Sequence, residues 1–193
     1  MEQFVAPRPA ESPEVFRTLV GSRLYGNDHA NSDFDIFVVT TSRLERETHD
    51  MTDEGDFTHR GIDLFLRRVR HGHPMSCEAA FSPVKEFTAD GDAWRPLIEG
   101  LRVTSPSAME RYERKIREFC VGGYKERFHA TRLSFNLEDL RLHGRFDPVM
   151  SDRQKDIAHS LASMKGYSLI RKLIPDDTTV LPDNLIRTLE RKQ

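Results

Sequence analysis

The sequence is poor in cysteine, in long apolar runs and in net charge. Only two cysteines, Cys77 and Cys120, occur among 193 residues, which predicts a reduced chain that does not depend on disulfides. No segment approaches the roughly 18 consecutive apolar residues that a membrane-spanning helix needs. The first 13 residues lack the apolar stretch of a secretory signal peptide. We therefore expect a cytoplasmic protein with no membrane partner.

The formal net charge is −2 at pH 7, so the chain as a whole has no positive field that would attract nucleic acid. Any contact with nucleic acid would come from a local basic patch. Three common motifs are also absent: the glycine-rich phosphate loop ending in Lys-Ser or Lys-Thr, the Gly-x-Gly-x-x-Gly turn, and the Gly-x-Ser-x-Gly elbow. These absences argue against a Walker-type ATPase, a Rossmann dehydrogenase and an α/β-hydrolase.

The first half of the chain has the pattern of an α/β unit. Residues 15–20 and 33–41 are rich in β-branched and aromatic residues, which predicts a short strand and a longer buried one. The polar stretch 42–56 is expected to be a mobile connection. Apolar residues then recur at the spacing of one helix face, and Gly72 and Pro74 predict the end of that helix and the start of the next. The helix face is formed by Ile62, Phe65, Leu66 and Val69.

The second half has the pattern of helices. Ser105 and Pro106 suit the N-cap and first position of a helix that continues to about residue 119. Gly122-Gly123 predicts an interruption, and further helices are expected over residues 125–142, 151–174 and 183–192. We therefore expect a catalytic domain over residues 1–104 and a helical region over residues 105–193.

One stretch carries residues suited to phosphate chemistry: Gly21-Ser22-Arg23 followed by Asp33-x-Asp35. Asp33 and Asp35 leave the same face of the expected strand, with Cβ atoms about 6 to 7 Å apart. This span suits two divalent ions held about 3.5 to 4 Å apart, and oxygen ligands favour Mg²⁺. Gly21 permits close backbone approach, and Ser22 with nearby backbone N–H groups can hold a triphosphate. Each feature alone is common in turns, but their order, with ten residues between Ser22 and Asp33, points to one site.

This combination resembles the polymerase-β-type nucleotidyltransferase superfamily, whose signature is Gly-Ser or Gly-Gly, a spacer of similar length, and Asp-x-Asp on a strand. More narrowly, GSRLYG and SDFDIF resemble a branch of stand-alone predicted nucleotidyltransferases, some of them associated with RNA-repair ligases. Residues 71–74, with Glu78 and Phe81, are similar to the Gly-Asn-Pro…Glu…Phe segment of that branch, with His73 in place of Asn.

Weaker similarity to the same branch extends into the C-terminal half. It covers residues 118–124, Lys155 and His159. An arginine that the branch often carries shortly after that histidine is absent, and Ala162 stands nearby. The resemblance implies an α/β (α+β) fold, in which a small mixed β-sheet with flanking helices is followed by a C-terminal helical region.

The superfamily has a third metal-binding carboxylate on a neighbouring strand, for which Asp56 and Asp63 are the candidates. Counting back without gaps from His73-Pro74 places the family position on Asp56. The helical periodicity argues the same way, because it puts Asp63 on the polar face, four residues before Arg67. The resemblance thus implies a catalytic, metal-binding set of Asp33, Asp35 and Asp56. Gly21, Ser22 and Arg23 would bind the triphosphate of an NTP.

By this resemblance we expect a Mg²⁺-dependent nucleotidyltransferase with two metal ions. Such an enzyme transfers a nucleoside monophosphate from an NTP such as ATP to a hydroxyl group and releases pyrophosphate. The family association makes an RNA 3′ end the first choice of acceptor, ahead of a protein hydroxyl and a small molecule. An alternative from another class is a catalytically inactive nucleotide-binding or regulatory module on the same fold.

Three further groups need an interpretation. His71, His73 and Cys77 match no common spacing of structural zinc ligands, so a surface histidine pair beside a helix end is the simpler interpretation. The arginines within residues 67–70 are either a solvated helix face or a contact for phosphates. Glu78 is either a helix-surface residue or a functional one.

Overall fold

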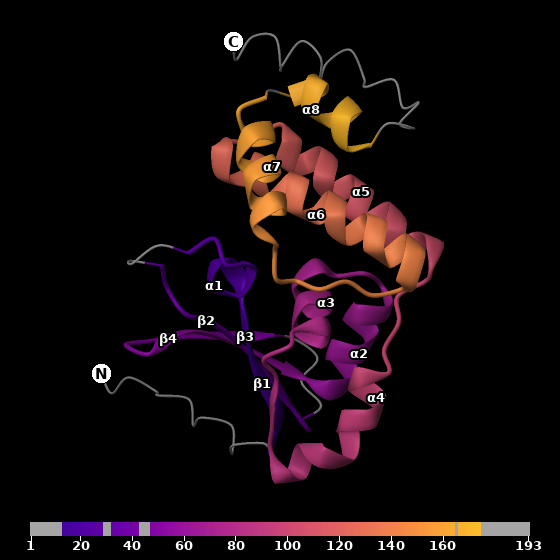
Figure 1. Ribbon diagram of the computed structural model, residues 1–193. Helices are drawn as coiled ribbons and strands as arrows, with labels where there is room; N and C mark the ends of the chain where they lie inside the picture. Colours follow the sequence, from indigo (N-terminus) through magenta and orange to yellow (C-terminus); the bar gives the residue numbers. More distant parts are fainter. Residues whose placement is uncertain (1–12, 29–31, 43–46, 165, 175–193) are drawn as a thin grey trace, which may run out of the picture.

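The computed structural model describes residues 13–28, 32–42, 47–164 and 166–174, and its architecture is mixed α/β. A five-stranded sheet carries helices on one face, and a helical part lies across the end of this unit (Figure 1). The expected fold class, a small mixed sheet with flanking helices followed by a helical C-terminal region, is confirmed. Within the described residues, no helix combines the length and the apolar character needed to cross a membrane.

The sheet brings three chain segments together at one end. Its strands are β1 (Glu14–Val20), β2 (Asp35–Thr40), β3 (Thr48–Thr52), β4 (Gly55–Gly61) and β5 (Glu86–Phe87), in the order β3-β4-β2-β1-β5. Strands β2 and β4 are parallel, and the other neighbouring pairs are antiparallel. The register sets Val20 opposite Asp35 and Asp35 opposite Asp56. The end of β1 and the starts of β2 and β4 therefore meet.

The helices form two groups that share one core. The N-terminal unit contains α1 (Gly21–Tyr25), α2 (Ile62–Arg70), α3 (Pro74–Phe81), the 3₁₀ helix η1 (Ala89–Trp94) and α4 (Arg95–Glu99). The C-terminal part contains α5 (Pro106–Cys120), α6 (Tyr124–His143), α7 (Asp152–Ala162) and α8 (Gly166–Leu173). Phe37 of β2, Phe65 of α2, Ile116 of α5 and Leu137 of α6 are buried in the same cluster. Apolar packing is therefore continuous across residue 104.

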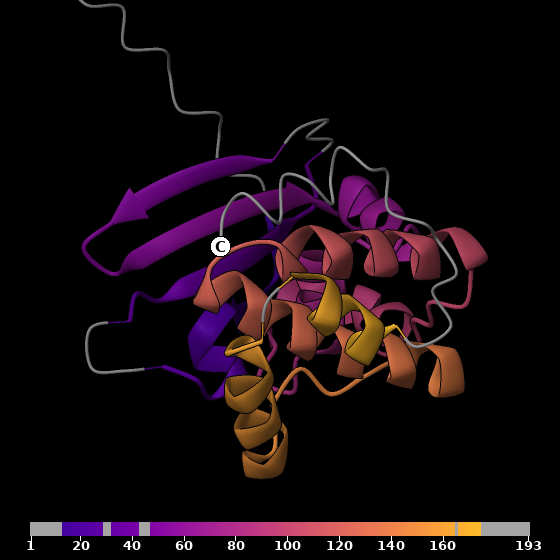
Figure 2. The ribbon, with the colours of Figure 1, turned by 90° about the horizontal axis from the view of Figure 1, so that it is seen from above.

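The long helices α5 and α6 lie side by side, and α7 packs on α6 above α1 (Figures 1 and 2). The expected start of α5 is confirmed, because the Ser105 hydroxyl accepts a hydrogen bond from the Ala108 N–H at 3.3 Å. The helices predicted from Ile62 and from Pro74 are confirmed as α2 and α3, and Gly72 between them has a φ of +65°.

Two predictions about local structure are wrong. The polar stretch 42–56 is not simply a mobile connection, because it contains β3 and the start of β4. Strand β3 lies at the sheet edge and is exposed along its whole length, so it lacks the alternation that marks a half-buried strand. The helix expected over 151–174 is divided, because α7 ends at Ala162 and α8 begins at Gly166. The helix expected over 183–192, and nearly all of the N-terminal arm, lie outside the described residues.

Candidate active site at the acidic end of the sheet

The turn from β1 into α1 is built for close contact with Asp35. Gly21 has a φ of +73°, a conformation that residues with a Cβ rarely adopt. A Cβ at this position would lie 2.0 Å from the Asp35 Oδ2 atom, so the carboxylate occupies the space that a side chain would need. The Gly-Ser sequence and the Asp-x-Asp sequence are therefore parts of one structure.

Asp56 is the carboxylate that the fold places beside Asp35. The two residues are partners on the parallel strands β2 and β4, which sets their backbones about 4.8 Å apart. The start of β4 is held by the Asp56 N–H, which donates to the Phe34 carbonyl at 2.8 Å. Gly55 allows this approach, because a Cβ there would lie 2.4 Å from the same carbonyl oxygen. The other candidate, Asp63, is exposed in the first turn of α2, beyond the far end of β4.

Asp33 lies just before β2, on the segment that Arg23 supports. The Arg23 guanidinium donates to the Ser32 carbonyl at 2.6 and 3.1 Å and to the Asp33 carbonyl at 3.3 Å. It also lies over the Phe34 ring, 3.9 Å from the ring centre. Arg23 therefore shapes the approach to β2 from α1. The phosphate-binding role expected for Arg23, like that of Ser22, stays a prediction.

The charges that act most on Asp35 are mainly negative. Burial raises the pKa of the Asp35 carboxyl above its ordinary value of 3.8, and the charges of Asp56 and Asp33 raise it further. Lys125, at the start of α6, acts in the opposite direction without cancelling the shift. We call Asp33, Asp35 and Asp56 the acidic end of the sheet.

The acidic end fits Mg²⁺ by its chemistry but is not a preformed ligand cage. In the described ranges, no three His, Cys, Asp or Glu side chains are gathered tightly enough to hold a metal ion as they stand. All the donors at the acidic end are carboxylate oxygens, which Mg²⁺ prefers, and their mutual repulsion favours a cation. Asp33 is exposed and Asp56 half-buried, so both side chains have room to rotate toward a shared ion.

A buried polar network lies directly behind the acidic end. Arg132 of α6 donates to the Glu78 carboxylate of α3 at 2.7 Å, and both side chains are almost fully buried. The Tyr25 hydroxyl donates to the other Glu78 oxygen, and the Arg132 guanidinium lies 3.7 Å from the centre of the Tyr25 ring. Glu78 is thus not a helix-surface residue. It joins α1, α3 and α6, and its charge also acts on Asp35.

Residues of helix α7 contact the loop that follows α1. The His159 ring lies between Asn27, whose Oδ1 is 3.0 Å from Nε2, and Tyr124, whose hydroxyl is 2.9 Å from Nδ1. Lys155 reaches Gly26, where a Cβ would lie 3.0 Å from its Nζ. The weak similarity at Lys155 and His159 therefore falls on residues that the fold brings to the loop after α1.

Sequence reasoning missed Arg132, Lys125 and Asn27. A weak signal for Arg132 was present in the sequence, because one row at four-residue spacing in the expected helix begins and ends with an apolar residue and contains two polar ones. This row consists of Phe128, Arg132, Asn136 and Leu140. Lys125 has no comparable signal, since only the packing of the helical part brings it near Asp35. Asn27 stands between the two motif segments in the chain, and only the tertiary structure shows that its side chain contacts His159.

The residues considered for zinc are not gathered into a ligand set within the described part of the chain. Cys77 is fully buried, and burial raises the pKa of its thiol to about 12. Burial lowers the pKa of His73 to about 4, while His71 is exposed. Arg67 and Arg70 are exposed on the outward side of α2, away from the core.

Comparison with known proteins adds no relative. Neither a scan against protein-family models nor a search of the curated proteins finds a match to the chain. The likeness to nucleotidyltransferases therefore rests on the residues of the motif.

Proposed function

We propose that the protein is a Mg²⁺-dependent nucleotidyltransferase that transfers a nucleoside monophosphate from an NTP to a hydroxyl group. The proposal rests on one observation: the Asp35 carboxylate packs closely against Gly21, and Asp35 is paired in register with Asp56 on a parallel strand. Two motif segments and a third carboxylate are thereby assembled at one end of the sheet. The excess negative charge there matches a site whose partner is a cation.

In this reaction the acceptor oxygen forms a bond to the α-phosphorus, the bond from that phosphorus to the bridging oxygen breaks, and pyrophosphate leaves. Asp33, Asp35 and Asp56 would hold two Mg²⁺ ions, which supply activation of the acceptor hydroxyl and neutralisation of the leaving group. Asp56, which is half-buried at the start of β4, would accept the acceptor's proton.

Residues around the acidic end would bind and orient the nucleotide. Ser22 and the first backbone N–H groups of α1 would hold the triphosphate, with Lys125 and Lys155 adding positive charge from the helical part. Arg23 would keep the Asp33 segment in place through the Ser32 carbonyl. The Glu78–Arg132 pair would hold α1 against α3 and α6, because Tyr25 joins it.

For the acceptor we propose an RNA 3′ end, on the strength of the resemblance. The exposed arginines of α2 offer a local patch that could contact phosphates, although the net charge of the chain is −2. A protein hydroxyl and a small molecule are the other acceptor classes to be tested.

The direct test incubates the protein with each α-labelled NTP and Mg²⁺, together with total RNA or a protein lysate. We expect label on one acceptor class, equimolar pyrophosphate release, and loss of both in Asp33→Ala/Asp35→Ala. Asp63→Asn is the matched control and should retain full activity. NTP binding without incorporation into any acceptor would instead favour the regulatory module.

A further inference from the structure

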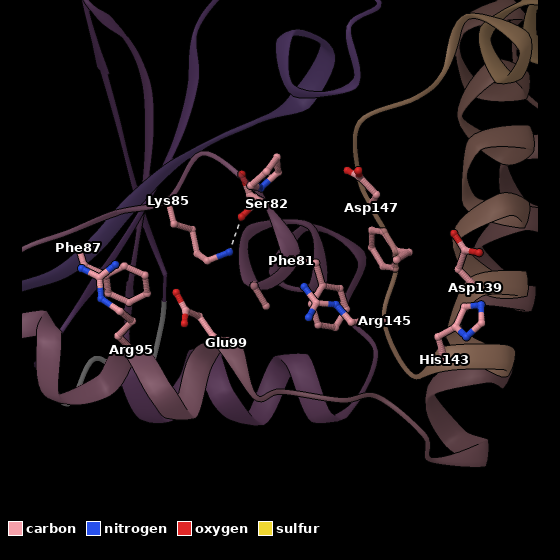
Figure 3. A pocket seen from close by; sticks show the side chains of 13 residues that line it. Phe81, Ser82, Lys85, Phe87, Arg95, Glu99, Asp139, His143, Arg145 and Asp147 are labelled. Atoms are coloured by element: carbon pink, nitrogen blue, oxygen red, sulfur yellow. Dashed lines mark hydrogen bonds between the residues drawn. The ribbon is translucent and has the colours of Figure 1, made fainter.

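A second charged site lies away from the acidic end. A cavity of about 820 Å³ is formed by the end of α3, β5, α4, the C-terminal end of α6 and the loop after it (Figure 3). Its volume is in the range of pockets that bind small molecules. None of Asp33, Asp35 and Asp56 lines it. Ser82 in the cavity wall directly follows α3, the helix that carries Glu78.

Lys85 and Arg145 both line the cavity, and neither forms an ion pair within the described part of the chain. Among the described residues the Lys85 ammonium donates to the Ser82 carbonyl, and the Arg145 guanidinium lies 5.7 Å from the centre of the Phe81 ring. Burial lowers the pKa of Lys85 to about 8, the charge of Arg145 contributes to the same shift, and the charge of Glu99 acts in the opposite direction. Two cations whose charges repel each other in a partly buried cavity favour an anion.

Two carboxylates and a histidine line the wall of the cavity across from Lys85. Asp139 and His143 come from the last turns of α6 and Asp147 from the loop after it, across from Lys85 in Figure 3. Neither aspartate forms an ion pair within the described residues, and Asp147 Oδ1 accepts only the Val149 N–H at 2.9 Å. Burial raises the pKa of Asp139. Carboxylates in this setting accept hydrogen bonds from hydroxyl groups.

We propose that this cavity binds a phosphate monoester of a sugar, either a free sugar phosphate or a nucleoside monophosphate. The phosphate lies between Lys85 and Arg145, whose two charges match a dianion. The sugar hydroxyls donate to Asp139 and Asp147 on the opposite wall. The site is separate from the acidic end, and the proposal does not depend on nucleotidyl transfer.

Titration calorimetry of the full chain in EDTA tests the proposal with ribose 5-phosphate, AMP, inorganic phosphate and adenosine. We expect both phosphate esters to bind saturably and adenosine not to bind. Lys85→Met and Arg145→Gln should each weaken binding at least tenfold, while Lys85→Arg and Arg145→Lys retain most of it. Asp139→Asn should weaken the esters but not inorganic phosphate. Equal affinity for both esters identifies a sugar phosphate, and tighter AMP identifies a nucleotide.

Matched controls separate this site from the acidic end and from general charge effects. Lys115→Met and Arg141→Gln each remove one cation outside the cavity, with 43% and 52% of its side chain exposed, and should leave the affinity unchanged. Asp33→Ala/Asp35→Ala should bind both esters like the unmodified chain, whatever its transfer activity. The proposal is overturned if neither ester binds, if binding survives both Lys85→Met and Arg145→Gln, or if the double aspartate variant abolishes it.

Discussion

The acidic end of the sheet and the buried pair Glu78–Arg132 are neighbours, but the carboxylates of the first repel one another and the charges of the second are paired. At the acidic end, burial and the charges of Asp56 and Asp33 raise the pKa of Asp35, and the charge of Lys125 lowers it without cancelling the shift. In the buried pair, one carboxylate meets one guanidinium at 2.7 Å, and Tyr25 satisfies the second carboxylate oxygen. Burial alone would lower the pKa of Arg132, but the charge of Glu78 raises it overall.

The difference separates charges that hold the protein together from charges kept for a ligand. A buried ion is costly unless it is paired and hydrogen-bonded, so the matched pair stabilises the junction of α1, α3 and α6 once it has formed. Unmatched carboxylates at the acidic end lower stability unless a cation binds. We therefore expect substitutions in the two regions to change stability in opposite directions.

The largest expected effect is that of Asp35→Asn on transfer. Loss of this carboxylate should lower nucleotidyl transfer roughly 10³- to 10⁴-fold, because it would bind both metal ions. The same substitution should raise the melting temperature of the Mg²⁺-free protein by a few degrees, because it removes a repelled, half-buried charge. Transfer assays and thermal melts at several pH values measure both effects.

The stability gain of Asp35→Asn should depend on pH. The folded-state pKa of Asp35 is raised, so ionisation destabilises the fold progressively as pH rises from the unfolded value to the folded one. The gain should be complete at neutral pH and vanish below about pH 4, where both states are protonated. Asp63→Asn should change neither activity nor melting temperature appreciably. A lower melting temperature for Asp35→Asn would show that the Asp35 carboxylate is paired. The acidic end would then not differ from the Glu78–Arg132 pair in its effect on stability.

The next effect in size is the loss of stability in Glu78→Gln. Leaving Arg132 buried without its counter-charge should lower the free energy of unfolding by about 3 to 5 kcal/mol, measured by urea denaturation at pH 7. The control is Glu118→Gln, whose pair with Lys115 has the same 2.7 Å separation but is exposed. That change should cost less than about 0.5 kcal/mol. Adding Arg132→Met should recover part of the loss, and equal costs for the two single variants would break the comparison.

Gly21→Ala tests whether the close packing of Asp35 matters. The new Cβ must displace the Asp35 carboxylate, so we expect transfer to fall about 100-fold. Gly144→Ala is the matched control, because Gly144 has a φ of +69°, close to the +73° of Gly21, but would meet only side chains at 3.1 Å or more. Both variants should lose about 1 to 2 kcal/mol of stability from backbone strain. Similar transfer activity in Gly21→Ala and Gly144→Ala would mean that the close packing of Asp35 against Gly21 is not needed for activity.

The smallest expected effect extends the comparison to the cavity, where Lys85 and Arg145, like Asp139 and Asp147, form no ion pair within the described residues. Lys85 is faced by Arg145 and Glu99, with Arg95, Asp139, His143 and Asp147 lining the same space. Because its pKa is about 8, Lys85 should take up a proton when a phosphate ester binds. The affinity for the ester should therefore fall about tenfold from pH 7 to pH 9. Calorimetry at both pH values measures this change. Lys85→Met should show a much flatter profile, and an equally steep one would assign the change to another group.

Local patterns predicted much of the fold correctly. The spacing of Ile62, Phe65 and Val69 gave α2, and the Ser105 cap gave the start of α5. Strand β3 was missed because an exposed edge strand buries neither face, so nothing constrains its residues to alternate. The division between α7 and α8 was missed because apolar spacing continues across it.

The acidic end was predictable only in part. The spacing predicted Asp33 and Asp35 on one strand, but β2 begins at Asp35 and Asp33 lies just before it. The register of β4 places Asp56, the preferred candidate, beside Asp35, and its metal-binding role stays a prediction. The conflict between a Cβ at position 21 and the Asp35 carboxylate was invisible, because it depends on how β1 and α1 meet β2. The buried partner of Glu78 was equally hidden, since Arg132 is 54 residues away in the chain.

The sequence by itself determined where the helices and the buried strands form, because periodicity and caps act over a few residues. Tertiary structure alone decided which charges are paired and which are left unmatched. Attraction and repulsion between charges depend on distances between segments far apart in the chain. Glu78 and Arg132 attract each other in this way, and Lys85 and Arg145 repel each other. Coulomb energies and desolvation are set by those distances and by burial, which no local pattern records.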